Sequence, residues 1–183
     1  MYNRIKQLLR ALFLSRKKNI EIHDTKNMRL SPRCRFGGVG KIVCLGGVEV
    51  LDNAAIMSAT KESVIEIGKN VFFNRNVIVA CRQRVVIGED TVIGPNVVIY
   101  DHDHRFDAHG RVKESAKDPY KLGDVIIGKN VWLGAGAVIL RGTIIGDNSI
   151  IAAGAVVKGN IPSGVLVRRE NNNIIEKLES KCF

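Results

Sequence analysis

Residues 127–157 read IGKNVW, LGAGAV, ILRGTI, IGDNSI and IAAGAV, followed by one valine, so the stretch divides into units of six. An aliphatic residue opens each unit, and the fifth place holds a small or β-branched residue. The opening residues are Ile127, Leu133, Ile139, Ile145, Ile151 and Val157, and the fifth-place residues are Val131, Ala137, Thr143, Ser149 and Ala155. A helix repeats every ~3.6 residues and a strand every ~2, so this period predicts a coil of short strands with a corner in each unit.

Glycine and asparagine fill the places where the corners are predicted. Glycine holds the second place at Gly128, Gly134 and Gly146 and the fourth at Gly136, Gly142 and Gly154, with Asn130 and Asn148 at the other fourth places. Both residue types adopt positive φ at little cost. We therefore predict that first-place side chains form an aliphatic core, that fifth-place side chains pack beside them, and that Gly and Asn make the corners.

These units resemble those of the hexapeptide-repeat acyltransferases, in particular the maltose, galactoside and capsular-polysaccharide O-acetyltransferases. The resemblance covers about residues 67–162, with a looser N-terminal part. It implies an all-β fold, a left-handed parallel β-helix, although the general rule for parallel crossovers gives the opposite hand. We divide the chain into an N-terminal helix at 1–19, a β-helix at 20–167 with an extruded loop at 101–124, and a C-terminal helical tail at 168–183.

The two ends of the β-helix are expected to be covered. Residues 2–18 have an amphipathic pattern, with basic residues on one face and no acid before Glu21. The residues at helical spacing are Ile5, Leu8, Leu9, Leu12 and Phe13. We favour a helix that caps the core, and we keep peripheral contact with anionic lipid as the alternative. Residues 20–66 predict irregular first coils, and residues 171–179 predict a short terminal helix over the open end.

Composition limits the core and the partners. Hydrophobic residues make up 45% of the chain and aromatic residues 5%, so the core must be aliphatic. The net charge of +10 favours an anionic partner such as coenzyme A, lipid or nucleic acid, but no nucleic-acid recognition motif is present. The sequence shows no CxxC pair, secretory signal or apolar run of ~20 residues, so we expect a cytoplasmic protein with reduced thiols. The cysteines are Cys34, Cys44, Cys81 and Cys182.

Residues 101–124, which read DHDHRFDAHGRVKESAKDPYKLGD, interrupt the repeat and predict the extruded loop. So long a loop in a compact repeat is uncommon unless it is functional. Three histidines lie in it, His102, His104 and His109. They could bind zinc, but we expect no metal, because no cysteine or compact fourth ligand is near. A neutral imidazole is instead a candidate general base.

The resemblance assigns the base. VVIYDHDH is similar to the family segment in which the catalytic histidine ends an eight-residue run from a coil valine, here Val97. That count falls on His104, which would deprotonate a sugar hydroxyl for attack on the thioester of acetyl-CoA. His102 is the second candidate. Asp101, grouped with the acceptor-binding residues, or Asp103 could instead orient an imidazole.

The same resemblance assigns the binding residues. Asn74 in FFNRN and Trp132, the only tryptophan, match residues near the acceptor sugar, although a plain corner residue is the alternative for Asn74. The Ala135 N–H, next to Gly134, matches the donor to the thioester oxygen, and the Ala153 backbone matches the wall of the pantetheine arm.

The chain departs from the family at the coenzyme phosphates. Lys158 and Gly159 stand where the family usually has a Thr-Lys pair, and VRRENNN replaces its terminal GxPA(R/K) signature. We expect Lys158, Arg168 and Arg169 to supply the positive charge, the alternative being a solvated basic end.

These features predict an acetyl-CoA-dependent O-acetyltransferase. The acceptor would be a sugar or lipid-linked saccharide, in capsule or other surface polysaccharide biosynthesis. The resemblance implies a homotrimer with its sites between subunits. The alternatives are an N-acetyltransferase of an amino sugar, a γ-type carbonic anhydrase, whose zinc histidines would be spread over neighbouring coils, and a non-catalytic β-helix module.

Overall fold

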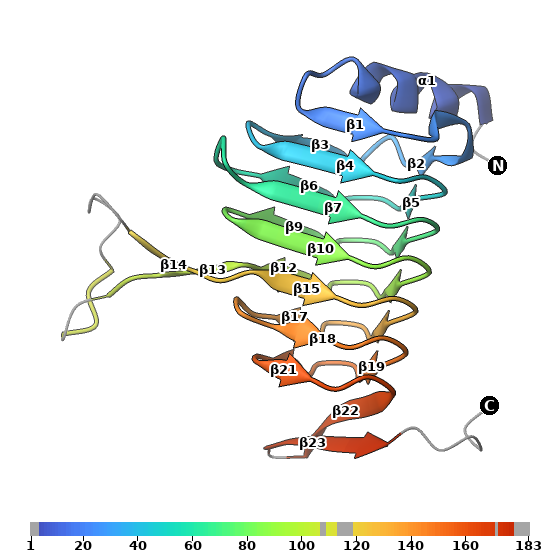
Figure 1. The fold of residues 1–183 in the computed structure, drawn as a ribbon. Coiled ribbons are helices and arrows are strands. Elements are labelled where there is room, and N and C mark those ends of the chain that lie inside the picture. Colours follow the sequence, from blue (N-terminus) through green and yellow to red (C-terminus); the bar gives the residue numbers. More distant parts are fainter. Residues whose placement is uncertain (1–3, 107–108, 113–118, 171, 178–183) are drawn as a thin grey trace.

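The computed structural model describes residues 4–106, 109–112, 119–170 and 172–177. The described chain begins with helix α1 (Arg4–Ser15), and the short 3-10 helix η1 (Thr25–Asn27) lies between the first strands. The remaining elements are short strands that stack in three sheets around a solenoid (Figure 1). A solenoid of parallel strands with an N-terminal helix is therefore confirmed.

The three sheets, here named A, B and C, are visited in that order by each coil. Sheet A contains β1 (Ile20–Ile22), β4 (Lys41–Cys44), β7 (Val64–Ile67), β10 (Arg84–Ile87), β15 (Val125–Ile127), β18 (Ile144–Ile145) and β21 (Asn160–Ile161). Sheet B contains β2 (Arg29–Leu30), β5 (Glu49–Val50), β8 (Phe72–Phe73), β11 (Val92–Ile93), β16 (Trp132–Leu133), β19 (Ile150–Ile151), β22 (Val165–Glu170) and β23 (Asn172–Lys177). Sheet C contains β3 (Arg35–Gly38), β6 (Ala55–Ser58), β9 (Ile78–Cys81), β12 (Val98–Tyr100), β17 (Val138–Ile139) and β20 (Val156–Val157).

The core follows the units of six. Every first-place aliphatic residue from Ile127 to Val157 is buried, and every fifth-place residue between them is buried beside it, as predicted. Two of the fifth-place residues are polar, and their hydroxyls donate to backbone carbonyls: Thr143 to Leu140 at 2.6 Å and Ser149 to Pro162 at 2.9 Å. Their burial therefore leaves no hydroxyl without a partner.

Glycine has two different roles at the corners. The fourth-place residues have positive φ, as expected, with 68° at Gly136 and 51° at Asn130. The second-place glycines are not among the residues of positive φ. Glycine is needed there because the backbone of the next coil leaves no room for a Cβ. A Cβ on Gly134 would lie 2.5 Å from the backbone nitrogen of Ala153, and one on Gly146 would lie 2.4 Å from that of Ser163.

The first coils stack in parallel register but are irregular in length, as expected. Ile42 of β4 pairs with Ile65 of β7, whereas Ile126 of β15 pairs with Ile144 of β18. The earlier coils thus contain more residues per turn, with longer corners between the same three sheets. These longer corners hide the period of six in the sequence.

Helix α1 lies across the N-terminal end of the solenoid (Figure 1). Ala11 is fully buried in the core and Leu14 packs against it, so the helix caps the first coil. Most of the predicted apolar face points elsewhere, because Ile5, Leu9 and Phe13 are exposed. None of the described helices has the length and apolar character needed to cross a bilayer.

The predicted C-terminal helix is wrong over residues 172–177. These residues form β23, which pairs antiparallel with β22 and extends sheet B. A strand can use the unpaired backbone groups of β22, an interaction that a helix packed on apolar side chains does not make. The rest of the predicted helix and Cys182 lie outside the described residues. Cys34, Cys44 and Cys81 are buried free thiols.

Candidate functional site

A two-stranded ribbon leaves the solenoid where the extruded loop was predicted. Strand β13 (His102–His104) pairs antiparallel with β14 (Tyr120–Leu122), and the ribbon projects from the side of the solenoid (Figure 1). It starts after β12 of sheet C and returns into β15 of sheet A. The Gly123 N–H donates to the Asp101 carbonyl at 2.9 Å, so the two ends of the ribbon meet at one corner.

Asp101, the residue before β13, is buried at the base of the ribbon. Its carboxylate accepts the backbone N–H of Arg82 at 2.9 Å and that of Gln83 at 2.6 Å, and it lies 2.9 Å from Nδ1 of His102. Burial acts to raise the pKa of Asp101, but His102 and the backbone N–H groups together lower it below its usual value. An ionised Asp101 therefore fixes the ring and the tautomer of His102. Since its side chain is fully buried, Asp101 lies behind the imidazole rather than on a surface that an acceptor sugar would touch.

The two candidate bases lie on one face of the ribbon. His102 and His104 are two residues apart on β13, and side chains alternate along a strand. The Tyr120 ring contacts both imidazoles; its centroid lies 5.4 Å from that of His102 and 4.8 Å from that of His104. The His102 side chain is only 14% exposed, packed edge-on between Tyr100 and Tyr120, whereas His104 is exposed.

Three polar contacts attach the ribbon to the coils. The Arg82 guanidinium donates to the Tyr120 hydroxyl at 2.9 Å and lies 3.6 Å from the centre of its ring. Asp103, on the opposite face of β13, forms an ion pair with Arg141 of the following coil. Gln83 donates through its side-chain amide to Asp124 at 2.5 Å.

Arg82, Tyr120 and Arg141 make contacts at the ribbon but are not among the site residues predicted from the sequence. One signal was present for Arg82, because the units of six lose their phase at VACRQR, before Val85 and Val86. That break places the N–H groups of Arg82 and Gln83 at the corner where they meet Asp101. Nothing in the sequence singles out Tyr120 or Arg141, since their partners lie 38 residues away along the chain.

The predicted thioester and acceptor residues gather at another corner. Trp132 lies in sheet B, and its side chain is 50% exposed. Asn74 follows β8, Ala135 follows β16 and Ala153 follows β19, so all three lie where sheet B turns toward sheet C. Among the described hydrogen bonds none uses the Ala135 N–H, whereas the Ala135 carbonyl accepts from Gly154 at 2.9 Å.

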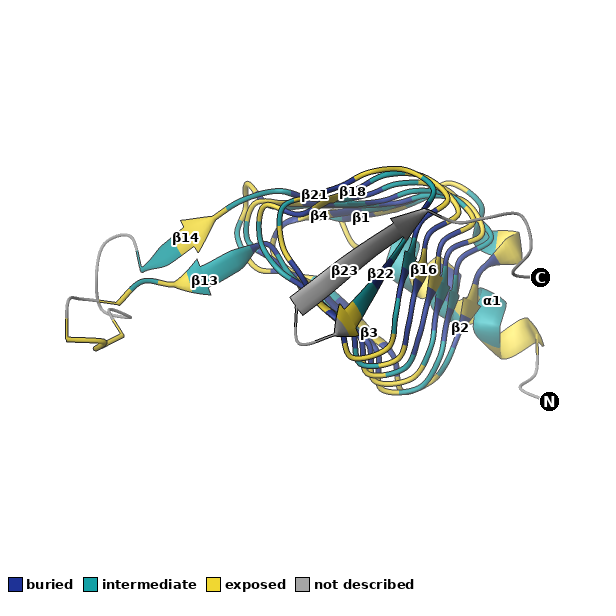
Figure 2. Ribbon diagram, turned by 90° about the horizontal axis from the view of Figure 1, so that it is seen from below, coloured by how far each residue is buried: buried dark blue, intermediate teal, exposed yellow. Residues whose placement is uncertain are grey.

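Within one chain these two groups of residues are separated. The histidine ribbon stands at the corner between sheets C and A, and the Asn74–Ala135–Ala153 corner lies between sheets B and C. The width of sheet C therefore separates them, and strand β16, which contains Trp132, lies across the solenoid from the ribbon (Figure 2). One chain brings together His102, His104 and Asp101, but it does not bring them to Trp132 or Ala135.

The three predicted phosphate-binding cations are also divided. Lys158 follows β20 at the corner between sheets C and A, below the ribbon, while Arg168 and Arg169 belong to β22 of sheet B. For metal binding, no group of three or more His, Cys, Asp or Glu side chains with the arrangement of a metal site occurs in the described ranges. His102 and His104 instead contact tyrosine rings, and His102 also contacts Asp101.

Residues 124–159 match the family described as bacterial transferase hexapeptide (six repeats). Among curated proteins, the galactoside O-acetyltransferase of Escherichia coli (strain K12) is 33% identical over 119 residues, which are 65% of this chain and 57% of that enzyme. The matched region covers between 57% and 64% of the length of that enzyme and of two other curated relatives.

Solved structures agree on the fold. A maltose O-acetyltransferase from Clostridium difficile 630 is 25% identical, with a TM-score of 0.59 over 97% of this chain and 89% of that one. A mutant of AntD, an N-acyltransferase from Bacillus cereus in complex with dTDP-4-amino-4,6-dideoxyglucose and coenzyme A, has a TM-score of 0.69. It is 16% identical and the match covers 97% of this chain and 91% of that one, so it supports the fold alone.

Proposed function

We propose that this chain is a member of the bacterial transferase hexapeptide family and an acetyl-CoA-dependent O-acetyltransferase whose acceptor is a sugar hydroxyl. The observation that carries the proposal is the ribbon that presents His104 at the surface, beside a second imidazole held by a buried carboxylate. A plain structural loop would need neither. With the family we also assign the solenoid a left-handed sense, and we place the reaction in the cytoplasm.

His104 is the proposed general base, and His102 is a positioning residue. The exposed ring of His104 can be reached by a hydroxyl, whereas His102 is enclosed by Tyr100 and Tyr120 and is bound to Asp101. His104 takes the proton of the hydroxyl as its oxygen forms a bond to the thioester carbonyl carbon. The C–S bond then breaks, and coenzyme A leaves as a thiolate that recovers the proton from the imidazolium.

The donor is proposed to bind along the corner between sheets B and C. Gly134 allows close stacking of the coils there, and the Ala135 N–H is available to the developing oxyanion, while Ala153 continues the same edge. Galactoside and maltose O-acetyltransferases among the relatives support a sugar acceptor, and coenzyme A in the AntD complex supports the donor. Asn74 and Trp132 are the proposed acceptor contacts on the same side, and Lys158, Arg168 and Arg169 are proposed to supply charge for the coenzyme phosphates.

A complete site then requires a second subunit, and we propose a homotrimer. The ribbon of one subunit would face the corner between sheets B and C of its neighbour. The outward face of sheet C suits such a contact, because its exposed side chains include Met57, Ile78 and Val156.

Acetyl transfer to a panel of sugars tests this proposal. Purified protein with acetyl-CoA should release free thiol only when a sugar with a free hydroxyl is present, and the product should gain one acetyl ester. Amino-sugar acceptors, compared with their hydroxyl analogues, separate O- from N-acetylation. Thiol release with none of the sugars, or with amino sugars alone, contradicts the proposal.

A further inference from the structure

Helix α1 has two apolar faces, and only one of them is used by the solenoid. The inner face packs through Ala11, which is fully buried, and through Leu14. The outer face carries a stripe, here named the α1 stripe, of Ile5, Leu9, Leu12 and Phe13. These side chains are 65%, 59%, 42% and 66% exposed. The cap therefore does not explain why the sequence keeps four large apolar residues on this helix.

Positive charge surrounds the α1 stripe. The segment from residue 4 to residue 20 contains no acidic residue. Its cations are Arg4, Lys6, Arg10, Arg16, Lys17 and Lys18. All but Arg10 are exposed, and Arg10 donates to the Cys34 carbonyl at 3.4 Å. A helix with exposed large apolar residues and only cationic charged residues has the composition of an interfacial helix.

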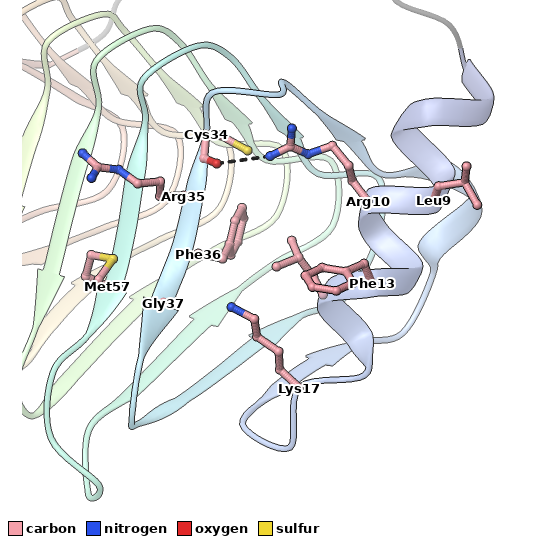
Figure 3. A pocket seen from close by; sticks show the side chains of 10 residues that line it. Leu9, Arg10, Phe13, Lys17, Cys34, Arg35, Phe36, Gly37 and Met57 are labelled. Carbon is pink, nitrogen blue, oxygen red and sulfur yellow. Dashed lines mark hydrogen bonds between the residues drawn. The ribbon is translucent and has the colours of Figure 1, made fainter.

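A groove beside the helix has the same chemistry. It lies between α1 and the β3 edge of sheet C and has a volume of about 570 Å³. Figure 3 shows Phe36 on its floor, Lys17 reaching toward it, and Arg10 and Arg35 at its side. Leu9 and Phe13 of the α1 stripe line the helix side of this groove. Apolar surface under nearby cations suits an acyl chain that carries an anionic headgroup.

We propose that α1 docks the protein on the surface of an anionic phospholipid bilayer, with the α1 stripe inserted and the surrounding cations on the headgroups. Charge complementarity favours an anionic bilayer over a second copy of α1, because two copies would bring like charges together. Each basic residue near an anionic surface adds to the attraction, so several exposed cations on one helix strengthen the contact together. Docking through α1 does not depend on the proposed acetyl transfer.

Vesicle sedimentation with the full chain tests the apolar part. Wild-type protein should sediment with vesicles of phosphatidylcholine containing about 30% phosphatidylserine and stay in solution with phosphatidylcholine alone. Leu9→Gln/Phe13→Gln should weaken binding at least about tenfold, because two inserted apolar side chains are lost. Phe106→Gln is the matched control, since Phe106 on the ribbon is 64% exposed and should leave binding unchanged. Equal loss with Phe106→Gln, or no sedimentation of the wild type, overturns the proposal.

A second pair of variants tests the charge. Lys6→Gln/Lys18→Gln should weaken binding about tenfold, whereas Lys61→Gln/Lys69→Gln, which removes equal charge elsewhere on the surface, should change it little. Binding should also fall when the salt is raised from about 0.1 M to about 0.5 M. Equal loss in both charge variants points to general attraction by net charge and contradicts docking through α1. Light scattering without vesicles completes the test, because a changed assembly mass in Leu9→Gln/Phe13→Gln would make the α1 stripe a subunit contact instead.

Discussion

The coils around residues 125–157 and the ribbon that starts at His102 hold their positions by different means. In the coils, equivalent side chains of successive turns have the same environment; Val92, Trp132 and Ile150, for example, pair in register across sheet B. In the ribbon each important side chain has its own partner, such as Asp101 for His102 and Arg82 for Tyr120. Stability is therefore distributed over the coils, whereas the proposed general base belongs to the ribbon, so substitutions can affect stability and activity separately.

Removing the ribbon should give the largest effect on activity. Replacement of residues 102–122 by two glycines is feasible because the Asp101 carbonyl and the Gly123 N–H are 2.9 Å apart. Loss of the proposed base and of its positioning residues should lower kcat by at least about 10⁴-fold. Thermal unfolding should stay cooperative. A shortened protein that still turns over at a tenth of the wild-type rate contradicts the separation of roles.

Leu133→Ala should instead affect stability. Leu133 is a fully buried first-place residue, so its truncation should lower the free energy of unfolding by about 2–5 kcal/mol. Leu122→Ala on the ribbon is the matched control, because Leu122 is exposed and should cost under about 0.5 kcal/mol. Urea unfolding of both variants checks the comparison, and similar losses in the two would show that the ribbon belongs to the cooperative core.

Two glycines separated by a single residue should differ for a physical reason. Gly134→Ala places a Cβ 2.5 Å from backbone of the next coil, which cannot move cheaply, so we expect a loss of about 3 kcal/mol. In Gly136→Ala the new Cβ has no atom within 4 Å, but the residue must keep a φ of 68°. Only this backbone strain should lower the free energy of unfolding, by about 1–2 kcal/mol. The order of the two values is the prediction, and urea unfolding decides it. A larger loss in Gly136→Ala would contradict the assigned role of close stacking.

The sequence predicted the coils well and the site only in part. The six-residue period is local, so it predicts the burial of the first and fifth places without any alignment. It also predicts the positive φ of Gly136 and Asn130. The contacts of Asp103 with Arg141 and of Arg82 with Tyr120 each join residues that are 38 positions apart in the sequence, so no local pattern predicts them. The C-terminal helix was predicted from side-chain spacing alone, whereas backbone pairing with β22 decides the structure there.

Asp101 should link stability to pH. Its folded pKa lies below its usual value of about 3.9, so its stabilising contribution is complete above that value and is lost as the pH falls through the folded pKa. Asp101→Asn should lower the free energy of unfolding at pH 7 by about 1–3 kcal/mol, because the amide replaces one of the two accepting oxygens with an NH2 group, which cannot accept a backbone N–H. The difference from wild type should shrink below about pH 3.9. A difference that is constant from neutral to acid pH would contradict an ionised Asp101 in the folded protein.

The rate of acetyl transfer in two single-histidine variants tests the central claim most directly. His104→Ala should lower kcat by about 10²–10⁴-fold with little change in coenzyme binding, since the proton acceptor is gone while the coils are intact. His102→Ala should lower it less, because His102 only positions the site. If His104→Ala retains near-normal turnover while His102→Ala is inactive, the base is His102. If both variants retain near-normal turnover, the proposed mechanism is wrong.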